Sequence, residues 1–293
     1  MTAMEIRRAE RHVTDDRSKI LQDFFQAVAS ARQSVLLLDY DGTLAPFQLD
    51  RYQAVPYHGV TTLLQTIMDT GHTRLVMITG RRASELIPLL KLSPPPEIWG
   101  SHGLEHLGKD GSYHMVDIDR ETLDALFEAD HWIDSLKLHD RAEHKPGSLA
   151  IHWRGLSEEE ADDIRSKVLL GWVPLAEDSN LMLEPFDGGL EIRVADRSKG
   201  DAVRSILSEV DRDAPVAYLG DDECDEDVFR VLKNRGLSVL VRQHWRETSA
   251  DLWLDPPDQL RDFLHDWLQA CLRGGADHPS AQMNYSHSTV RRA

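Results

Sequence analysis

The stretch Val-Leu-Leu-Leu-Asp-Tyr-Asp-Gly-Thr-Leu at positions 35–44 decides the fold. Its first four residues are apolar, which is typical of a parallel strand that is buried on both faces. Asp39 and Asp41 come directly after them, and ligands of open α/β sheets bind at this carboxyl end of the strands. Two converging carboxylates must repel each other, bind a metal or share a proton. The pattern predicts a chemical site at the end of a central strand, whereas a lone Asp-x-Asp would also suit a solvated loop.

Three later segments strengthen the prediction of a site. Residues 75–81 are an apolar run that ends in Thr-Gly-Arg, and Lys199 stands just before a helical pattern. Residues 217–227 run from an apolar strand into a dense acidic loop. Each segment alone is weak, because a lysine at a helix start is commonly exposed and a threonine at a strand end is commonly a cap. Together they would bring hydroxyl, cation and carboxylate groups to one edge of a sheet.

In their order, the four segments resemble the signature of the haloacid dehalogenase-like phosphatases: Asp-x-Asp-Gly-Thr, then Ser/Thr, then Lys, then Gly-Asp-Asp. The resemblance implies a doubly wound, Rossmann-like parallel α/β core and Mg²⁺-dependent phosphoryl transfer. Two alternatives remain: a phosphomutase or phosphotransferase, and a regulatory module that binds sugar phosphates without turnover. The second has no need of the intact acids Asp39, Asp41 and Asp221 or of Lys199.

Phosphoryl transfer requires a nucleophile and a proton donor for the leaving oxygen. It also requires positive charge that stabilises the negative equatorial oxygens. Asp39 suits the nucleophile and Asp41 the general acid, while Thr79 and Lys199 suit the grip on the phosphoryl group. Hard oxygen ligands suit Mg²⁺. The candidate metal ligands are Asp39, Asp41 through its backbone carbonyl, Asp221 and Asp222.

The chain pattern changes twice along its length. Residues 16–111 and 195–272 show the α/β rhythm of a core, with Gly108–Gly111 as the exit turn. Residues 112–194 alternate helices with short strands, which predicts an inserted α+β cap with an antiparallel sheet. Residues 1–15 are expected to be a frayed helix or disordered, and residues 273–293 a disordered tail.

The cap carries the more specific resemblance. Residues 143–154 look like the cap signature of trehalose-6-phosphate phosphatases, Glu-x-Lys followed by Ser-x-Ala and His-aromatic-Arg. Tyr40 and Pro46 in the first motif, and the segment 190–193, are similar to the same family. The resemblance implies hydrolysis of trehalose 6-phosphate to trehalose and phosphate. The implied substrate-binding residues are Gly80, Arg81, His102, Glu143, Lys145, Arg154 and Glu191, with a solvated polar face as the alternative for the cap residues and a structural role as the alternative for His102.

Three positions depart from that family. Thr79 stands where Ser is commoner, Cys224 stands where Thr is usual, and residues 186–189 lack a lysine that often precedes the position of Glu191. The missing lysine bears on which sugar phosphate is the substrate. A phosphatase of another glycosyl phosphate, for example glucosylglycerol phosphate, is therefore the alternative substrate assignment.

Composition indicates the class of partner. The formal net charge of −17 argues against nucleic acid or an anionic membrane as a partner. An anionic sugar phosphate then needs local cations such as Arg81 and Lys199. Two cysteines are too few for a disulfide framework, and no membrane span or signal peptide is recognisable. We expect a cytoplasmic monomer that is coupled to a trehalose-phosphate synthase.

Overall fold

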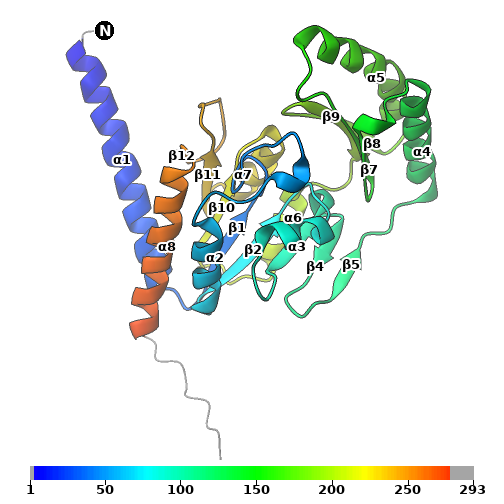
Figure 1. The fold of residues 1–293 in the computed structure, drawn as a ribbon. Helices are drawn as coiled ribbons and strands as arrows, with labels where there is room; N and C mark the ends of the chain where they lie inside the picture. The colour runs from blue at the N-terminus through cyan, green and yellow to red at the C-terminus, as the bar shows by residue number, and fades with distance from the viewer. Residues whose placement is uncertain (1–2, 278–293) are drawn as a thin grey trace, which may run out of the picture.

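The computed structural model of the chain describes residues 3–277, with side chains described for residues 17–274. The chain forms a core around an eight-stranded sheet and a cap around a four-stranded sheet (Figure 1). The residues of the predicted chemical site lie between these two units. The predicted α/β core with an inserted α+β cap is confirmed.

The core sheet places β1 near its middle. Its strand order is β12 (Leu252–Leu254), β11 (Leu237–Val241), β10 (Val216–Gly220), β1 (Ser34–Leu38), β2 (Thr73–Ile78), β3 (Glu97–Gly100), β4 (Glu105–Leu107) and β5 (Tyr113–Met115). The first six strands run parallel, and β4 and β5 are antiparallel additions. Ligands bind at the carboxyl ends of such parallel strands.

Helices cover both faces of the core sheet. Leu36 and Leu38 of β1 pack into the cluster that includes residues of α1 (Ala3–Ser30), α2 (Val60–Asp69), α3 (Ala83–Leu90) and α8 (Asp258–Asp277). Val35 and Leu37 face the opposite cluster, built with α6 (Lys199–Ser208) and α7 (Glu226–Leu232). Because successive side chains of a strand point to opposite faces, one apolar run fills both layers.

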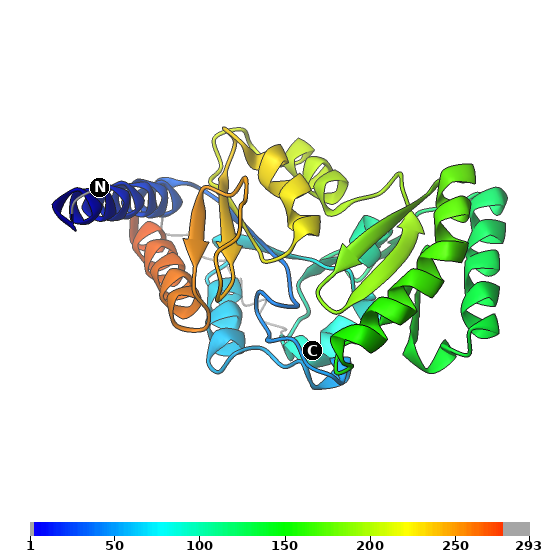
Figure 2. The ribbon, with the colours of Figure 1, turned by 90° about the horizontal axis from the view of Figure 1, so that it is seen from above.

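The cap has a sheet and a hydrophobic core of its own. Its antiparallel strands follow the order β6 (Ala142–Lys145), β7 (Ser148–His152), β9 (Gly189–Val194) and β8 (Leu181–Phe186). The helices α4 (Arg120–Ser135) and α5 (Glu158–Asp178) pack on one face of this sheet around the buried Trp172. In Figure 2 the sheet lies between these helices and the core. Short 3-10 helices occur at Arg51–Gln53, Ser101–Gly103, His139–Arg141 and Glu223–Asp225.

The first crossing into the cap comes later than the sequence predicts. Residues 108–112 are the turn of a hairpin, and β5 beyond it pairs with β4 in the core sheet. Val116 still donates a backbone hydrogen bond to the carbonyl of Leu104, at 2.9 Å. The boundary at residues 111–112 is therefore wrong: the cap begins between Met115 and α4. The short strand β12 was also not predicted.

The two ends of the described chain are more helical than expected. α1 begins at Ala3, and the absence of Gly and Pro from residues 3–30 suits a continuous helix. α8 continues to Asp277, past the predicted end at residue 272. At Gly274 a Cβ would come within 2.4 Å of the Ala29 carbonyl oxygen, so this glycine lets α8 approach the end of α1. The tail predicted over 278–293, and residues 1–2, lie outside the described residues.

None of the helices in the described range combines the length and the apolar character that a bilayer crossing requires.

Candidate functional site

Three neighbouring parallel strands end at the site. β1 lies between β2 and β10, and the residues that follow these strands are Asp39, Thr79 and Asp221. The backbone N–H of Asp39 donates to the Leu219 carbonyl at 2.9 Å, which continues the β1–β10 ladder to the carboxylate. Asp39, Thr79 and Asp221 are all buried. The sheet therefore fixes the backbone that carries the predicted nucleophile.

Lys199 is the buried cation of the site. Ser198 caps α6, with its hydroxyl accepting from the Asp201 N–H at 3.2 Å, and this places Lys199 at the first helical position. The Lys199 ammonium lies 2.9 Å from Asp39 Oδ1 and 2.8 Å from Asp225 Oδ1. Burial opposes this charge, but Asp225 and Asp39 outweigh it and hold the pKa of Lys199 well above its ordinary value. Lys199 is therefore a fixed positive charge beside Asp39.

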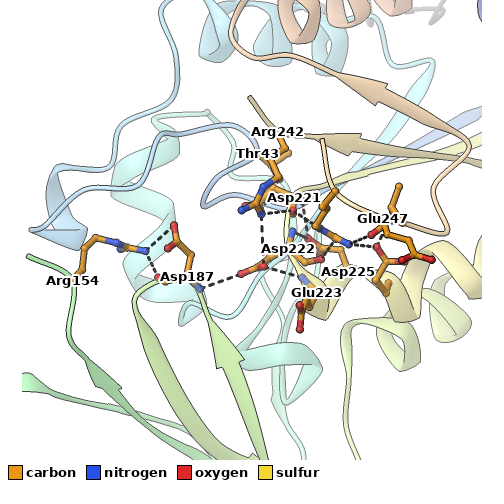
Figure 3. A network of polar contacts seen from close by, with 12 residues as sticks. Thr43, Arg154, Asp187, Asp221, Asp222, Glu223, Asp225, Arg242 and Glu247 are labelled. Carbon is orange, nitrogen blue, oxygen red and sulfur yellow. Dashed lines mark hydrogen bonds and ion pairs between the residues drawn. The ribbon is translucent and has the colours of Figure 1, made fainter. Parts of the chain in front are cut away.

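Asp225 organises the acidic loop. Its Oδ2 accepts the backbone N–H groups of Asp221 at 2.8 Å and Asp222 at 3.0 Å. Its Oδ1 accepts from Lys199 and from the buried hydroxyl of Tyr218. Figure 3 shows Asp225 beside Asp221 and Asp222 at the end of β10. With both oxygens occupied, Asp225 is suited to orienting the groups around it.

The acids at the strand ends suit a divalent cation. Carboxylate oxygens of Asp39, Asp221 and Asp225 lie within 4.8 Å of one another, and all three residues are buried. Burial, and to a smaller degree the charge of Asp225, raises the pKa of Asp39 to about 7 against the pull of Lys199. Burial and the neighbouring acids also raise the pKa of Asp221 well above its ordinary value. One lysine does not balance three acids, and hard oxygen donors fit Mg²⁺.

Gly42 allows the two acidic segments to meet. Its φ is +76°, and a Cβ at this position would lie 1.9 Å from Asp221 Oδ2. Thr43 next to it donates its hydroxyl to Asp221 Oδ1 at 3.3 Å. A side chain at position 42 would therefore displace the carboxylate of Asp221.

The structure does not bring the side chains of Asp41 and Asp222 into this acidic group. Both oxygens of Asp41 accept hydrogen bonds from Arg81, from Nε and from Nη2 at 2.6 Å each. Asp222 Oδ1 accepts the Glu223 N–H at 2.9 Å, and Oδ2 accepts the Asp187 N–H of the cap at 3.4 Å. A metal role for Asp41 rests on its backbone carbonyl, and the role of Asp222 as a metal ligand stays a prediction.

The cap presents a row of alternating charges to the core. In the β6–β7–β9 register, Glu143 pairs with Ala150 and Ala150 with Glu191, so the two glutamates share a sheet face. The Lys145 ammonium lies 2.7 Å from Glu191 Oε1 and 3.9 Å from Glu143 Oε1. His102 of the core approaches Glu191 Oε2 at 3.1 Å, which links the row to the core.

The surroundings of both cap glutamates favour the ionised form. Burial opposes the charge of Glu143, but the hydrogen bond from His152 and the charges of Lys145 and Arg51 lower its pKa to about 2. Burial is likewise outweighed at Glu191, where Lys145 and His102 hold the pKa well below the usual range. An ionised carboxylate is an acceptor only and can accept from two hydroxyl groups of a sugar.

All predicted site residues line one cleft between the core and the cap. They are Asp39, Asp41, Thr79, Gly80, Arg81, His102, Glu143, Lys145, Arg154, Glu191, Lys199, Asp221 and Asp222. Arg81 also carries a buried Nη1 without a hydrogen-bond partner among the described side chains, so it keeps a donor for a ligand. The acidic chain thus gathers several cations at one place.

Other cavity residues were missed or not given a role. They are Phe47, Gln48, Arg51, His152, Phe186 and Cys224. The first three belong to the β1–α2 connection, where no periodic pattern indicates which side chains turn inward. Phe47 lies under the guanidinium of Arg154, whose Cζ is 4.6 Å from the ring centroid. Figure 3 shows the same guanidinium beside Asp187, with Nη2 3.6 Å from Asp187 Oδ2.

Comparison with known proteins gives a consistent result. A model of the trehalose-phosphatase family matches residues 37–257. The chain is 28% identical over 263 residues to Trehalose 6-phosphate phosphatase RA3 of Zea mays, covering 81% of this chain and 70% of that protein. The trehalose-6-phosphate phosphatase C-terminal domain of C. albicans has a similar fold, with a TM-score of 0.72 at 17% identity over 86% of this chain and 96% of that one. A phosphatase of the haloalkanoate enzyme superfamily from Bacteroides thetaiotaomicron gives a TM-score of 0.53 at 18% identity over 83% and 95% of the two chains.

Proposed function

The chain belongs to the trehalose-phosphatase family and is a phosphoric monoester hydrolase, and we propose that it hydrolyses trehalose 6-phosphate through an aspartyl-phosphate with Mg²⁺ as its metal. One observation carries the proposal. One cleft is lined both by the buried Lys199–Asp39 pair of the core and by the charged row Glu143–Lys145–Glu191 of the cap. The first suits a phosphoryl group, and the second suits the hydroxyl groups of a disaccharide.

In the first step, an oxygen of Asp39 attacks phosphorus and the bond from phosphorus to the sugar oxygen breaks. Lys199 holds the attacking carboxylate in place and favours its ionised form against the effect of burial. Thr79 and Lys199 bind equatorial oxygens. Asp41, which has to release one of its two hydrogen bonds from Arg81 to carry a proton, gives that proton to the leaving sugar oxygen. Trehalose leaves and the phosphoryl group stays on Asp39.

In the second step, Asp41 takes a proton from water, and the water oxygen attacks the same phosphorus. The acyl–phosphate bond breaks, which restores the Asp39 carboxylate and releases inorganic phosphate. Arg81 orients Asp41 through its paired hydrogen bonds. These bonds stabilise the ionised carboxylate, which is the form that acts as a base. The proton that Asp41 gave in the first step is thereby recovered.

Mg²⁺, when bound, supplies positive charge that stabilises the transferring phosphoryl group. Asp39, Asp221 and the carbonyl of Asp41 would hold it, and Asp225 would fix the loop that carries Asp221. The mutual proximity of the buried acids supports this assignment.

Glu143, Lys145 and Glu191 would bind the sugar hydroxyls, with Arg154 at the edge of the cavity. The absence of the lysine noted before Glu191 favours testing a second substrate, such as glucosylglycerol phosphate. Transfer of the phosphoryl group to an acceptor sugar instead of water is the other alternative. Product analysis with and without an acceptor sugar distinguishes it.

We expect phosphate release from trehalose 6-phosphate in a screen of sugar phosphates with Mg²⁺, because the cap row matches several hydroxyl groups at once. Release is measured with a colorimetric phosphate assay. EDTA should abolish it and added Mg²⁺ should restore it. Activity that persists after EDTA would contradict the metal assignment, and a preference for another glycosyl phosphate would contradict the substrate assignment.

We also expect the cap to move. A disaccharide that contacts both units needs an open state for entry and a closed state that excludes water. The hinges are expected between Met115 and α4 and at Ala195–Ser198. Small-angle scattering should give a smaller radius of gyration when Mg²⁺ and a non-hydrolysable analogue are added, and identical profiles would contradict closure.

The cellular setting is part of the proposal. Both cysteines, Cys224 and Cys271, are free, which fits a reducing cytoplasm. A trehalose-phosphate synthase would supply the substrate. A monomer is expected, and the molecular mass from the same scattering data checks it.

A further inference from the structure

We propose that Arg51, in the connection between β1 and α2, is a positioning residue that sets specificity for the disaccharide by orienting Glu143 of the cap. The inference rests on the proposed function, because Glu143 is taken to bind the sugar. Arg51 acts through Glu143 and not on the phosphoryl group.

Arg51 joins the core to the cap through two ion pairs. Its Nη2 pairs with Glu85 Oε2 of α3, and its Nη1 pairs with Glu143 Oε1 of β6. The three side chains are only 22%, 21% and 15% exposed, respectively. A half-buried guanidinium between two carboxylates is held in a fixed orientation, because its planar donors point in fixed directions.

The two ion pairs complete a longer row. From Glu85 the charges alternate through Arg51, Glu143, Lys145 and Glu191, and the row ends on His102. Glu85 and His102 belong to the core, whereas Glu143, Lys145 and Glu191 belong to the cap. The sugar-facing side chains of the cap are thus held between two groups of the core.

The geometry at Glu143 gives Arg51 a role beyond holding the cap against the core. His152 occupies Glu143 Oε2 at 2.8 Å, so Oε1 is the oxygen that Arg51 orients, with Lys145 3.9 Å away. Arg51 itself lines the cavity, and its buried Nε has no hydrogen-bond partner among the described residues. Loss of Arg51 would leave Oε1 free to turn toward Lys145 and away from a sugar hydroxyl.

Arg82 offers a matched control. It also crosses from core to cap, where its Nη2 donates to the backbone carbonyl of His144 at 2.8 Å. This contact falls on the residue next to Glu143 but engages no side chain of the charged row. Arg82→Met therefore removes a core–cap contact made by an arginine without touching Glu143.

The test compares Arg51→Met with Arg82→Met on trehalose 6-phosphate and on p-nitrophenyl phosphate, which lacks the sugars. For Arg51→Met we expect kcat/KM on trehalose 6-phosphate to fall roughly 10- to 100-fold, mostly through KM, because one partner of a half-buried charge pair is lost. The generic ester should change by about twofold or less. Arg51→Lys should restore part of the loss, and Arg82→Met should show no such preference.

Equal losses for Arg51→Met and Arg82→Met on the disaccharide would overturn the proposal in favour of simple docking. Equal losses on both substrates would do the same. If Arg51→Met does not fold, Glu85→Gln removes the core anchor of Arg51 and should raise KM for trehalose 6-phosphate selectively, and no change would again overturn the proposal. Failure of the wild-type protein to hydrolyse trehalose 6-phosphate would instead refute the proposed function.

Discussion

Replacing Asp39 by Asn is expected to lower phosphate release by roughly four to six orders of magnitude, which is the scale of losing a covalent nucleophile. The amide of Asn cannot form the acyl-phosphate, and the remaining groups of the site have no second carboxylate in the same position. Lys199 would keep Asp225 as its partner at 2.8 Å. The measurement is single-turnover and steady-state phosphate release with Mg²⁺ present.

Folding of the Asp39→Asn protein is the control. Burial raises the pKa of Asp39 from 3.8 to about 7, so the ionised carboxylate costs free energy in the folded state. That cost develops as the pH rises from about 4 to 7 and is complete above it. At pH 8 without Mg²⁺ the variant should therefore unfold at a temperature no lower than the wild type. A folded variant with near-normal turnover would refute the mechanism.

Replacing Glu143 by Ala is expected to impair hydrolysis of trehalose 6-phosphate far more than hydrolysis of p-nitrophenyl phosphate. Loss of a buried charged acceptor costs on the order of 2–4 kcal/mol, or roughly 30- to 1000-fold in kcat/KM. The small ester needs only the core groups Asp39, Asp41, Thr79 and Lys199 with the metal. The measurement is kcat/KM for both substrates.

Glu143→Gln serves as the control for shape. It keeps the size of the side chain and one acceptor oxygen but removes the charge that Arg51 and Lys145 neutralise. An intermediate loss on trehalose 6-phosphate is expected. Equal losses on both substrates would point to defective folding or closure, and an unchanged rate on trehalose 6-phosphate would show that Glu143 does not bind the sugar.

Much of the core could be predicted because its signals are local. Four apolar residues before Asp39 are typical of a short buried strand, and the strand at 237–241 follows from the same pattern. Parallel strands in such a sheet share one functional edge, so the order of the motifs was enough to bring Asp39, Thr79 and Asp221 together.

The rest depended on tertiary structure. The hairpin of β4 and β5 has only three residues in each strand, too few for a period to appear, so the core–cap boundary was placed too early. A sequence also does not show where a carboxylate points. Asp41 accepts hydrogen bonds from Arg81, and Asp222 accepts one from a backbone N–H. Arg51 lies in a loop, where no periodic pattern predicts which side chains point inward.

The separate hydrophobic core of the cap has a consequence for how such an enzyme changes its substrate. The apolar cluster around Trp172 contains only residues from Ile118 to Val194, so no side chain of the phosphatase core belongs to it. A cap with these properties is an exchangeable unit that enters and leaves the core through two short crossings. Grafting a different cap at those crossings would leave the phosphoryl-transfer groups in place, but it would succeed only if the new cap offers an acid to receive Arg51.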